Sequence, residues 1–101
     1  MPLIKVANIN DLKDGEARTV SANGEAIALY RINDKFYATT NTCPHRGGPL
    51  GEGFLEDEVV ACPWHGWRYD VKTGMCTNMP GVKIQTFNVI VQGNDVMVEV
   101  P

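Results

Sequence analysis

The sequence predicts an all-β domain, built as an antiparallel sandwich or barrel. Most segments alternate apolar and polar side chains, and short turns rich in Gly, Asn and Asp separate them. No segment keeps the 3.6-residue period of a long amphipathic helix. Many short strands without long helices are typical of sandwiches and barrels, and 101 residues suffice for one domain with a modest core.

The first half of the chain contains four segments that fit strands. Asn23-Gly24, the strongest short hairpin signal, separates the second segment from the third, and Asn33-Asp34 separates the third from the fourth. Residues 10–15 offer a candidate N-cap and a final glycine, so we expect one helical turn there. The expected strands are Leu3 to Ala7, Ala17 to Ala22, Glu25 to Ile32 and Lys35 to Thr40.

The second half predicts further short strands. Glu56-Asp57-Glu58 separates two apolar segments, which indicates a hairpin that leads to Cys62. Gly93-Asn94-Asp95 predicts the last turn, and the alternation over 84–92 predicts one continuous strand. The expected strands are 54–55, 59–61, 67–70, 84–92 and 96–100.

Two short loops carry the groups with the most distinctive chemistry. Cys43-Pro44-His45 and Cys62-Pro63-Trp64-His65-Gly66 each bring a thiol and an imidazole together, and they use both histidines of the chain. Thiolates and imidazoles select zinc or an iron–sulfur centre over calcium or magnesium. If the two cysteines bind one metal and the two histidines another, each loop touches both metals. That scheme fits a [2Fe-2S] cluster in which two histidines replace two cysteines on one iron.

The sequence resembles the Rieske family. The resemblance rests on C-x-H, sixteen intervening residues and C-x2-H, with Pro44, Gly47, Pro63 and Gly66 also in pattern, and it continues through 67–70, 72–74 and 79–81. It implies one [2Fe-2S] cluster per chain, held by Cys43, His45, Cys62 and His65. It also implies a β base fold, about 1–40 and 81–101, with an inserted cluster-binding subdomain of about 41–80.

The resemblance assigns roles to three neighbouring residues. Tyr69 matches a family tyrosine whose hydroxyl donates to a cluster cysteine, and Pro80 belongs to a third loop that covers the cluster. Trp67 stands where high-potential members have a serine donor, so we expect a potential toward the low end of the Rieske range, about −150 mV rather than +300 mV. Apolar residues on or beside the loops could form a rim for a docking partner: Pro49, Leu50, Trp64 and Pro80.

Charge, apolar content and cysteine count indicate the partners and the compartment of the protein. A net charge of −3 and a pI near 5.2 argue against nucleic acid and anionic membranes as partners. The N-terminal residues lack the features of a signal peptide, and no apolar run approaches the roughly 20 residues of a membrane span. In membrane-anchored family members a disulfide braces the cluster loops, whereas Gly48 and Trp64 stand at the matching positions here. Because Cys76 is the only cysteine left, we expect a reducing, cytoplasmic setting. We also expect a monomer.

Three functions compete. The resemblance favours a soluble ferredoxin that carries electrons from a flavin-dependent reductase to a terminal oxygenase. The alternatives are the small subunit of a larger redox enzyme, such as NAD(P)H nitrite reductase, and a zinc-stabilised binding module. We expect no enzyme activity of its own, because the oxygenases of this family need a separate iron with two more histidines, and the chain has none to spare.

Overall fold

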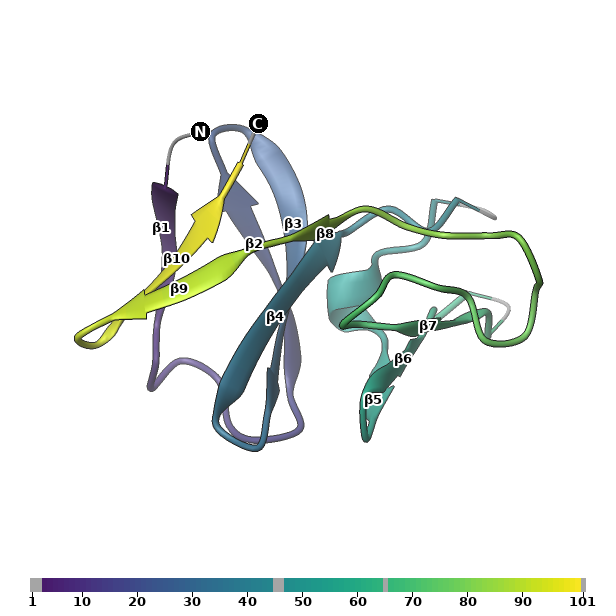
Figure 1. Cartoon of the computed structure of the whole chain (residues 1–101), viewed down its shortest axis with the longest axis horizontal. Coiled ribbons are helices and arrows are strands. Elements are labelled where there is room, and N and C mark those ends of the chain that lie inside the picture. The colour runs from purple at the N-terminus through teal and green to yellow at the C-terminus, as the bar shows by residue number, and fades with distance from the viewer. Residues whose placement is uncertain (1–2, 45–46, 65, 101) are drawn as a thin grey trace.

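The computed structural model describes residues 3–44, 47–64 and 66–100. Within them, three antiparallel sheets follow one another along the 37 Å long axis of the molecule (Figure 1). The fold class predicted from the sequence is confirmed. The strands are β1 (Leu3–Asn8), β2 (Ala17–Ala22), β3 (Glu25–Ile32), β4 (Lys35–Thr40), β5 (Phe54–Glu56), β6 (Val59–Ala61), β7 (Arg68–Asp70), β8 (Thr86–Phe87), β9 (Val89–Gln92) and β10 (Asp95–Glu99).

The first two sheets form a sandwich. One has the strand order β1-β10-β9 and the other β2-β3-β4-β8. Apolar side chains from the facing surfaces of both sheets fill the space between them, among them Leu29 from β3 and Val96 and Val98 from β10, all fully buried. This burial of apolar surface is the main force that holds the two sheets together.

Strand β3 is buried on both faces. Ile27 and Leu29 point into the core of the sandwich, while Ala28 and Tyr30 point into a second core on the opposite face. Successive side chains of a strand point to opposite faces, so one strand can serve two cores. The near-continuous apolar sequence of β3, Ala26 to Tyr30, reflects this position.

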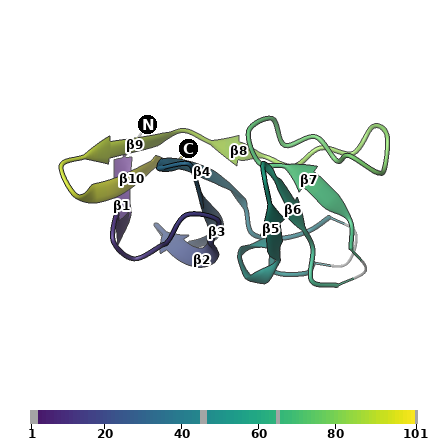
Figure 2. The ribbon, with the colours of Figure 1, turned by 90° about the horizontal axis from the view of Figure 1, so that it is seen from below.

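The third sheet, with strand order β5-β6-β7, closes the second core (Figures 1 and 2). Leu55, Val60 and Tyr69 stand opposite one another across the three strands and share the inner face of this sheet. They pack in the same cluster as Tyr30 of β3, and the sulfurs of Cys43 and Cys62 belong to this cluster too.

The hairpin between β2 and β3 forms as predicted. Asn23 and Gly24 both adopt left-handed backbone conformations, with φ of 54° and 83°. Such a pair connects strands through a two-residue turn whose twist matches that of the strands. Ala22 therefore pairs directly with Glu25, and the register runs unbroken to the pair of Ala17 and Tyr30.

Two predictions about local structure are wrong. Residues 10–15 form bends and turns instead of a helical turn: the backbone bonds there, from the Asp11 amide to the Asn8 carbonyl and from the Glu16 amide to the Lys13 carbonyl, belong to two separate turns. The single strand expected over 84–92 is two strands, since the chain changes sheets at Asn88. A 3₁₀ helix that the sequence did not suggest, η1, spans Leu50–Glu52.

Across the described ranges, no helix has the length and apolar character required to cross a membrane.

Candidate metal centre

The first loop, residues 42–49, is a narrow hairpin that places Cys43 near its root. Thr42 pairs with Pro49, and the Cys43 amide donates to the Gly48 carbonyl at 3.0 Å. The Gly47 amide returns to the Cys43 carbonyl at 2.6 Å. These bonds fix the backbone on both sides of the cysteine. His45 lies outside the described residues.

The second loop, residues 62–67, repeats the same backbone pattern. The Cys62 amide donates to the carbonyl five residues on, that of Trp67, at 2.8 Å, and the Gly66 amide returns to the Cys62 carbonyl at 3.2 Å. Gly66 has a φ of 71°, and Gly47 of the first loop has 73°, a region that glycine enters without strain. Both cysteines are thus presented by equivalent turns. His65 lies outside the described residues.

The two loops face each other, and Gly48 makes their close approach possible. A Cβ atom at position 48 would lie 2.6 Å from the Cys62 sulfur and 3.3 Å from the ring of Trp64. No side chain fits in that space without moving the sulfur. The resemblance matches Gly48 and Trp64 to two cysteines that bridge the loops in anchored family members, and a side chain at position 48 would lie against the Trp64 ring.

Both loop cysteines are buried free thiols, 0% and 2% exposed. Burial raises the pKa of the Cys62 thiol; the Trp64 backbone amide acts in the opposite direction, and the neighbouring Cys43 thiol raises the pKa further. Two buried thiols close enough to affect each other resist ionisation unless a cation joins them. A metal ion supplies that positive charge and binds the deprotonated sulfurs.

Tyr69 reaches this pair from β7. Its hydroxyl lies 3.3 Å from the Cys43 sulfur, and its side chain is fully buried. Burial raises the pKa of Tyr69, and the contact with Cys43 raises it further, so the hydroxyl keeps its proton at neutral pH. Towards a sulfur that has lost its own proton, Tyr69 can only donate. The tuning role that the resemblance assigned to Tyr69 stays a prediction, but its geometry is in place.

The other predicted neighbours differ in position. Trp67 packs partly buried against the core around the sulfurs, and its carbonyl closes the second loop. Pro80 is exposed in the third loop, residues 77–81, which is held to β7 by a bond from the Arg68 amide to the Asn78 side chain at 3.1 Å. Leu50 is fully buried beneath the first loop, so it cannot contribute to a docking rim as the sequence had suggested.

The donor set fits a [2Fe-2S] cluster. Two buried thiols from facing loops can bind one iron, and a protonated hydroxyl is ready to donate to one of them. The third cysteine, Cys76, is directed to a different partner, the side-chain oxygen of Asn78 at 3.3 Å. Among the described residues, which exclude both histidines, no three His, Cys, Asp or Glu side chains gather as metal ligands.

Sequence reasoning missed Asn41, one of two buried polar side chains in the described part of the chain. Its side-chain oxygen accepts bonds from the Gly51 amide and the Thr19 hydroxyl, so it joins the root of the first loop to β2. An asparagine that follows a strand and precedes a loop gives the ordinary signal of a turn residue. No local pattern shows a partner 22 residues away.

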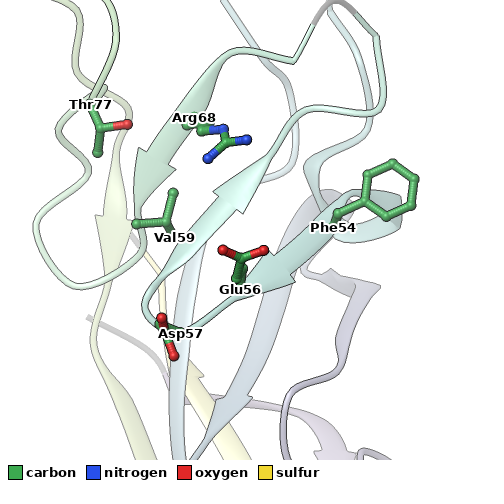
Figure 3. Close-up of a pocket in the computed structure, with 6 residues that line it drawn as sticks. All are labelled: Phe54, Glu56, Asp57, Val59, Arg68 and Thr77. Atoms are coloured by element: carbon green, nitrogen blue, oxygen red, sulfur yellow. The ribbon is translucent and has the colours of Figure 1, made fainter.

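A separate pocket lies on the outer face of the third sheet, with a volume of about 250 Å³ (Figure 3). Its walls include Arg68 and the strongly exposed Phe54, whose neighbours along their strands, Tyr69 and Leu55, pack in the core that contains the sulfurs. Strand alternation explains this, because Tyr69, next to Arg68, faces the opposite way. The lining residues are Phe54, Glu56, Asp57, Val59, Arg68 and Thr77.

The fold and the paired loops define an iron–sulfur protein with a sandwich base, and the comparisons name its family. The model of the Rieske [2Fe-2S] domain matches residues 3–88. Ferredoxin CarAc of Metapseudomonas resinovorans is 40% identical over 97 residues, 94% of this chain and 91% of that protein. The ferredoxin component of biphenyl 2,3-dioxygenase from Rhodococcus jostii (strain RHA1) is 37% identical over 100 residues, 98% of this chain and 94% of that protein.

A solved structure agrees with these relatives. It is described as a complex of reduced oxygenase and oxidized ferredoxin in carbazole 1,9a-dioxygenase, and the matching chain is 39% identical with a TM-score of 0.87, covering 95% of this chain and 91% of that chain. The present chain belongs to the Rieske [2Fe-2S] family. It is a ferredoxin that carries one [2Fe-2S] cluster and serves as an electron carrier, not as an enzyme. The zinc-stabilised binding module is thereby set aside.

Proposed function

We propose that this protein accepts electrons one at a time from a flavin-dependent reductase and delivers them to the terminal oxygenase of an aromatic-ring dioxygenase system. The observation that carries the proposal is the likeness to ferredoxin components along nearly the full length of both chains. The similar solved chain, described in complex with an oxygenase, supports the identity of the acceptor.

Cys43 and Cys62 would hold one iron of the cluster, and His45 and His65 the other. When bound, the cluster provides a centre that takes up and releases a single electron. The chain's own residues prepare this centre. The paired loop hydrogen bonds fix both cysteines, the Tyr69 hydroxyl is placed to donate to the Cys43 sulfur once that sulfur is deprotonated, and the surrounding apolar core excludes water from the sulfur side. Exclusion of water strengthens such bonds.

The histidine side of the cluster would be the route of the electron to a partner. Trp64 immediately precedes His65 and is 49% exposed. Exposed apolar groups near a redox centre suit a small and short-lived docking interface.

Trp67 supports a low reduction potential. Position 67 has no hydroxyl group to donate to the cluster, and each donor that is lost leaves the reduced, more negative cluster less stabilised. We expect about −150 mV, and a measured potential above roughly +100 mV would contradict this interpretation of Trp67.

Three further parts of the proposal concern organisation and setting. The chain would be a single Rieske domain with a base of about 1–40 and 81–101 and a cluster-binding subdomain of about 41–80. The cytoplasm is the setting that we infer, because three free cysteines suit a reducing compartment. A monomer is expected.

The first test is spectroscopic and kinetic. Anaerobically purified protein should be red-brown, contain about two irons and two acid-labile sulfides per chain, and bleach on reduction. Mixed with the reductase and the oxygenase encoded nearest to its gene, it should restore NADH-dependent turnover that the two enzymes lack alone. Colourless protein without iron would remove the function. A small subunit of nitrite reductase would instead co-purify with a large subunit, whereas a ferredoxin elutes alone.

A further inference from the structure

Asn41 lies at the root of the first loop, where β4 has just ended, and uses two oxygens to hold the returning chain. Its backbone carbonyl accepts a bond from the Leu50 amide at 2.7 Å, and its side-chain oxygen accepts one from the next amide, that of Gly51, at 2.8 Å. One residue thus binds two consecutive amides on the far side of the loop.

The same side-chain oxygen accepts a third bond, from the Thr19 hydroxyl of β2 at 3.1 Å. Thr19 lies in β2, which β3 separates from β4 in the same sheet, so this bond joins the loop root to a more distant strand of the base sandwich. The contact is tight on both sides: a Cβ atom at Gly51 would lie 2.6 Å from the backbone nitrogen of Thr19. We call Asn41, Thr19 and Gly51 the loop clasp.

The loop clasp makes the first of three successive pairings between the two sides of the loop root, and the third involves Cys43. Asn41 is bonded to Leu50, Thr42 pairs with Pro49, and Cys43 is bonded to Gly48. A slip of the returning chain by one residue would break both of these bonds, and in one direction it would bring Pro49, which has no amide hydrogen, opposite the Asn41 carbonyl, so the clasp favours this register. Register then decides where Gly48 lies, and Gly48 is the residue that faces the Cys62 sulfur.

A buried polar side chain with several matched partners is costly to disturb, because each partner is left unpaired away from water. Asn41 is 8% exposed. Removal of its side chain would leave the Gly51 amide and the Thr19 hydroxyl without their acceptor. The strain would fall on the loop root, two residues from Cys43.

We propose that Asn41 is a positioning residue: through the loop clasp it fixes the register of the first loop on the base sandwich and so keeps the Cys43 sulfur opposite that of Cys62. This inference rests on the proposed ligand role of the two cysteines. It goes beyond that role because Asn41 touches neither sulfur and acts through the backbone.

The test compares cluster retention in the holoprotein. Asn41→Ala should lose its visible absorption to an excess of chelator roughly tenfold faster than wild type, well below the unfolding temperature, because the loop root opens without its acceptor. Asn41→Asp, which keeps an acceptor oxygen, should recover most of the retention. Thr19→Val, which removes only one donor, should lose the cluster at a rate between those of wild type and Asn41→Ala. It replaces Asn41→Ala as the test variant if Asn41→Ala does not fold.

Thr39→Val is the matched control, since Thr39 is the other buried polar residue in the described part of the chain and its hydroxyl bonds to Tyr30 of β3 and to the Thr40 carbonyl, not to the first loop. It should lower the unfolding temperature without changing the rate of cluster loss. Equal acceleration in Thr39→Val and Asn41→Ala, or no acceleration in Asn41→Ala, would overturn the inference.

Hydrogen exchange separates this inference from the proposed function. In Asn41→Ala the amides of Gly47, Gly48, Leu50 and Gly51 should exchange faster while those of β2 and β3 keep their protection. If wild-type protein holds no iron, the ligand assignment fails, yet this exchange result still reports on the loop clasp. Unchanged exchange at 47–51 in a protein that holds iron would instead count against the clasp alone.

Discussion

The hydroxyl of Tyr69 lies 3.3 Å from the sulfur of Cys43, and both groups are buried in the core that β3 shares with the third sheet. A hydrogen bond to a ligand sulfur is strengthened when the iron is reduced, because the sulfur then carries more negative charge. Loss of the bond should therefore destabilise the reduced state more than the oxidised state.

Tyr69→Phe should lower the reduction potential. If the bond is stronger by about 1 kcal/mol in the reduced state, the potential falls by roughly 40 mV, since 59 mV corresponds to a factor of ten for one electron. Protein-film voltammetry would measure the change. Tyr30→Phe is the control, because Tyr30 is equally buried but bonds to Thr39; it should reduce stability and leave the potential unchanged.

Substitution of each cysteine should distinguish the two proposed cluster ligands from Cys76. Cys43→Ser and Cys62→Ser should each abolish or severely reduce cluster content, because a serine oxygen is a poor substitute for thiolate on iron. Cys76→Ser should retain the cluster, since the Cys76 sulfur is engaged with Asn78. Iron and sulfide analysis of the three purified variants provides the measurement. Full cluster content in Cys62→Ser would refute the assignment of that ligand.

Gly48→Ala should prevent normal cluster assembly, because the added methyl group would lie 2.6 Å from the Cys62 sulfur. Gly24→Ala is the control, because it adds the same methyl group at another glycine. Gly24 has a φ of 83° with open space around it, so alanine there costs about 1 kcal/mol of backbone strain and touches nothing. Visible spectra and unfolding temperatures should show lost colour in the first variant and reduced stability with normal colour in the second. Normal colour in Gly48→Ala would mean that the loops can separate.

Stability should decline at alkaline pH as two tyrosines are forced to ionise. Burial raises the pKa of both Tyr30 and Tyr69 above the ordinary value of about 10. A raised folded-state pKa contributes stability that is complete below pH about 10 and is lost as the pH increases beyond it. Absorbance at 295 nm, followed from pH 9 to 13, should show these two tyrosines ionising together with unfolding. Their ionisation in a protein that remains folded would contradict the burial.

Alternation and turn chemistry predict most of this fold. The bounds expected for β2, β3 and β4 agree with the structure, because Asn23-Gly24 and Asn33-Asp34 mark the turns without ambiguity. The split at Asn88 escaped prediction for a physical reason. Alternation reports which face of a strand is buried, not which strand lies beside it, and Phe87 pairs with β4 whereas Val89 pairs with β10.

The candidate site, like the fold, was predicted only in part from the sequence. The candidate cysteine ligands and the glycine turns beside them can be predicted from the loop sequences, because metal binding restricts both the type and the spacing of the ligands. Contacts between distant segments leave no such local mark. Leu50 reads as an exposed loop residue but is buried, and Asn41 finds Thr19 only after the chain has folded.

β3 supplies side chains to the cores on both of its sides. The two halves of the molecule therefore share this strand and do not form independent units. The segment of the two loops and the third sheet, cut out by itself, would lose β3 and expose the inner surface of β5, β6 and β7 to solvent. The sandwich cut out by itself would leave Tyr30 uncovered. Evolution or engineering can therefore transplant this redox module only as a whole, with its scaffold attached.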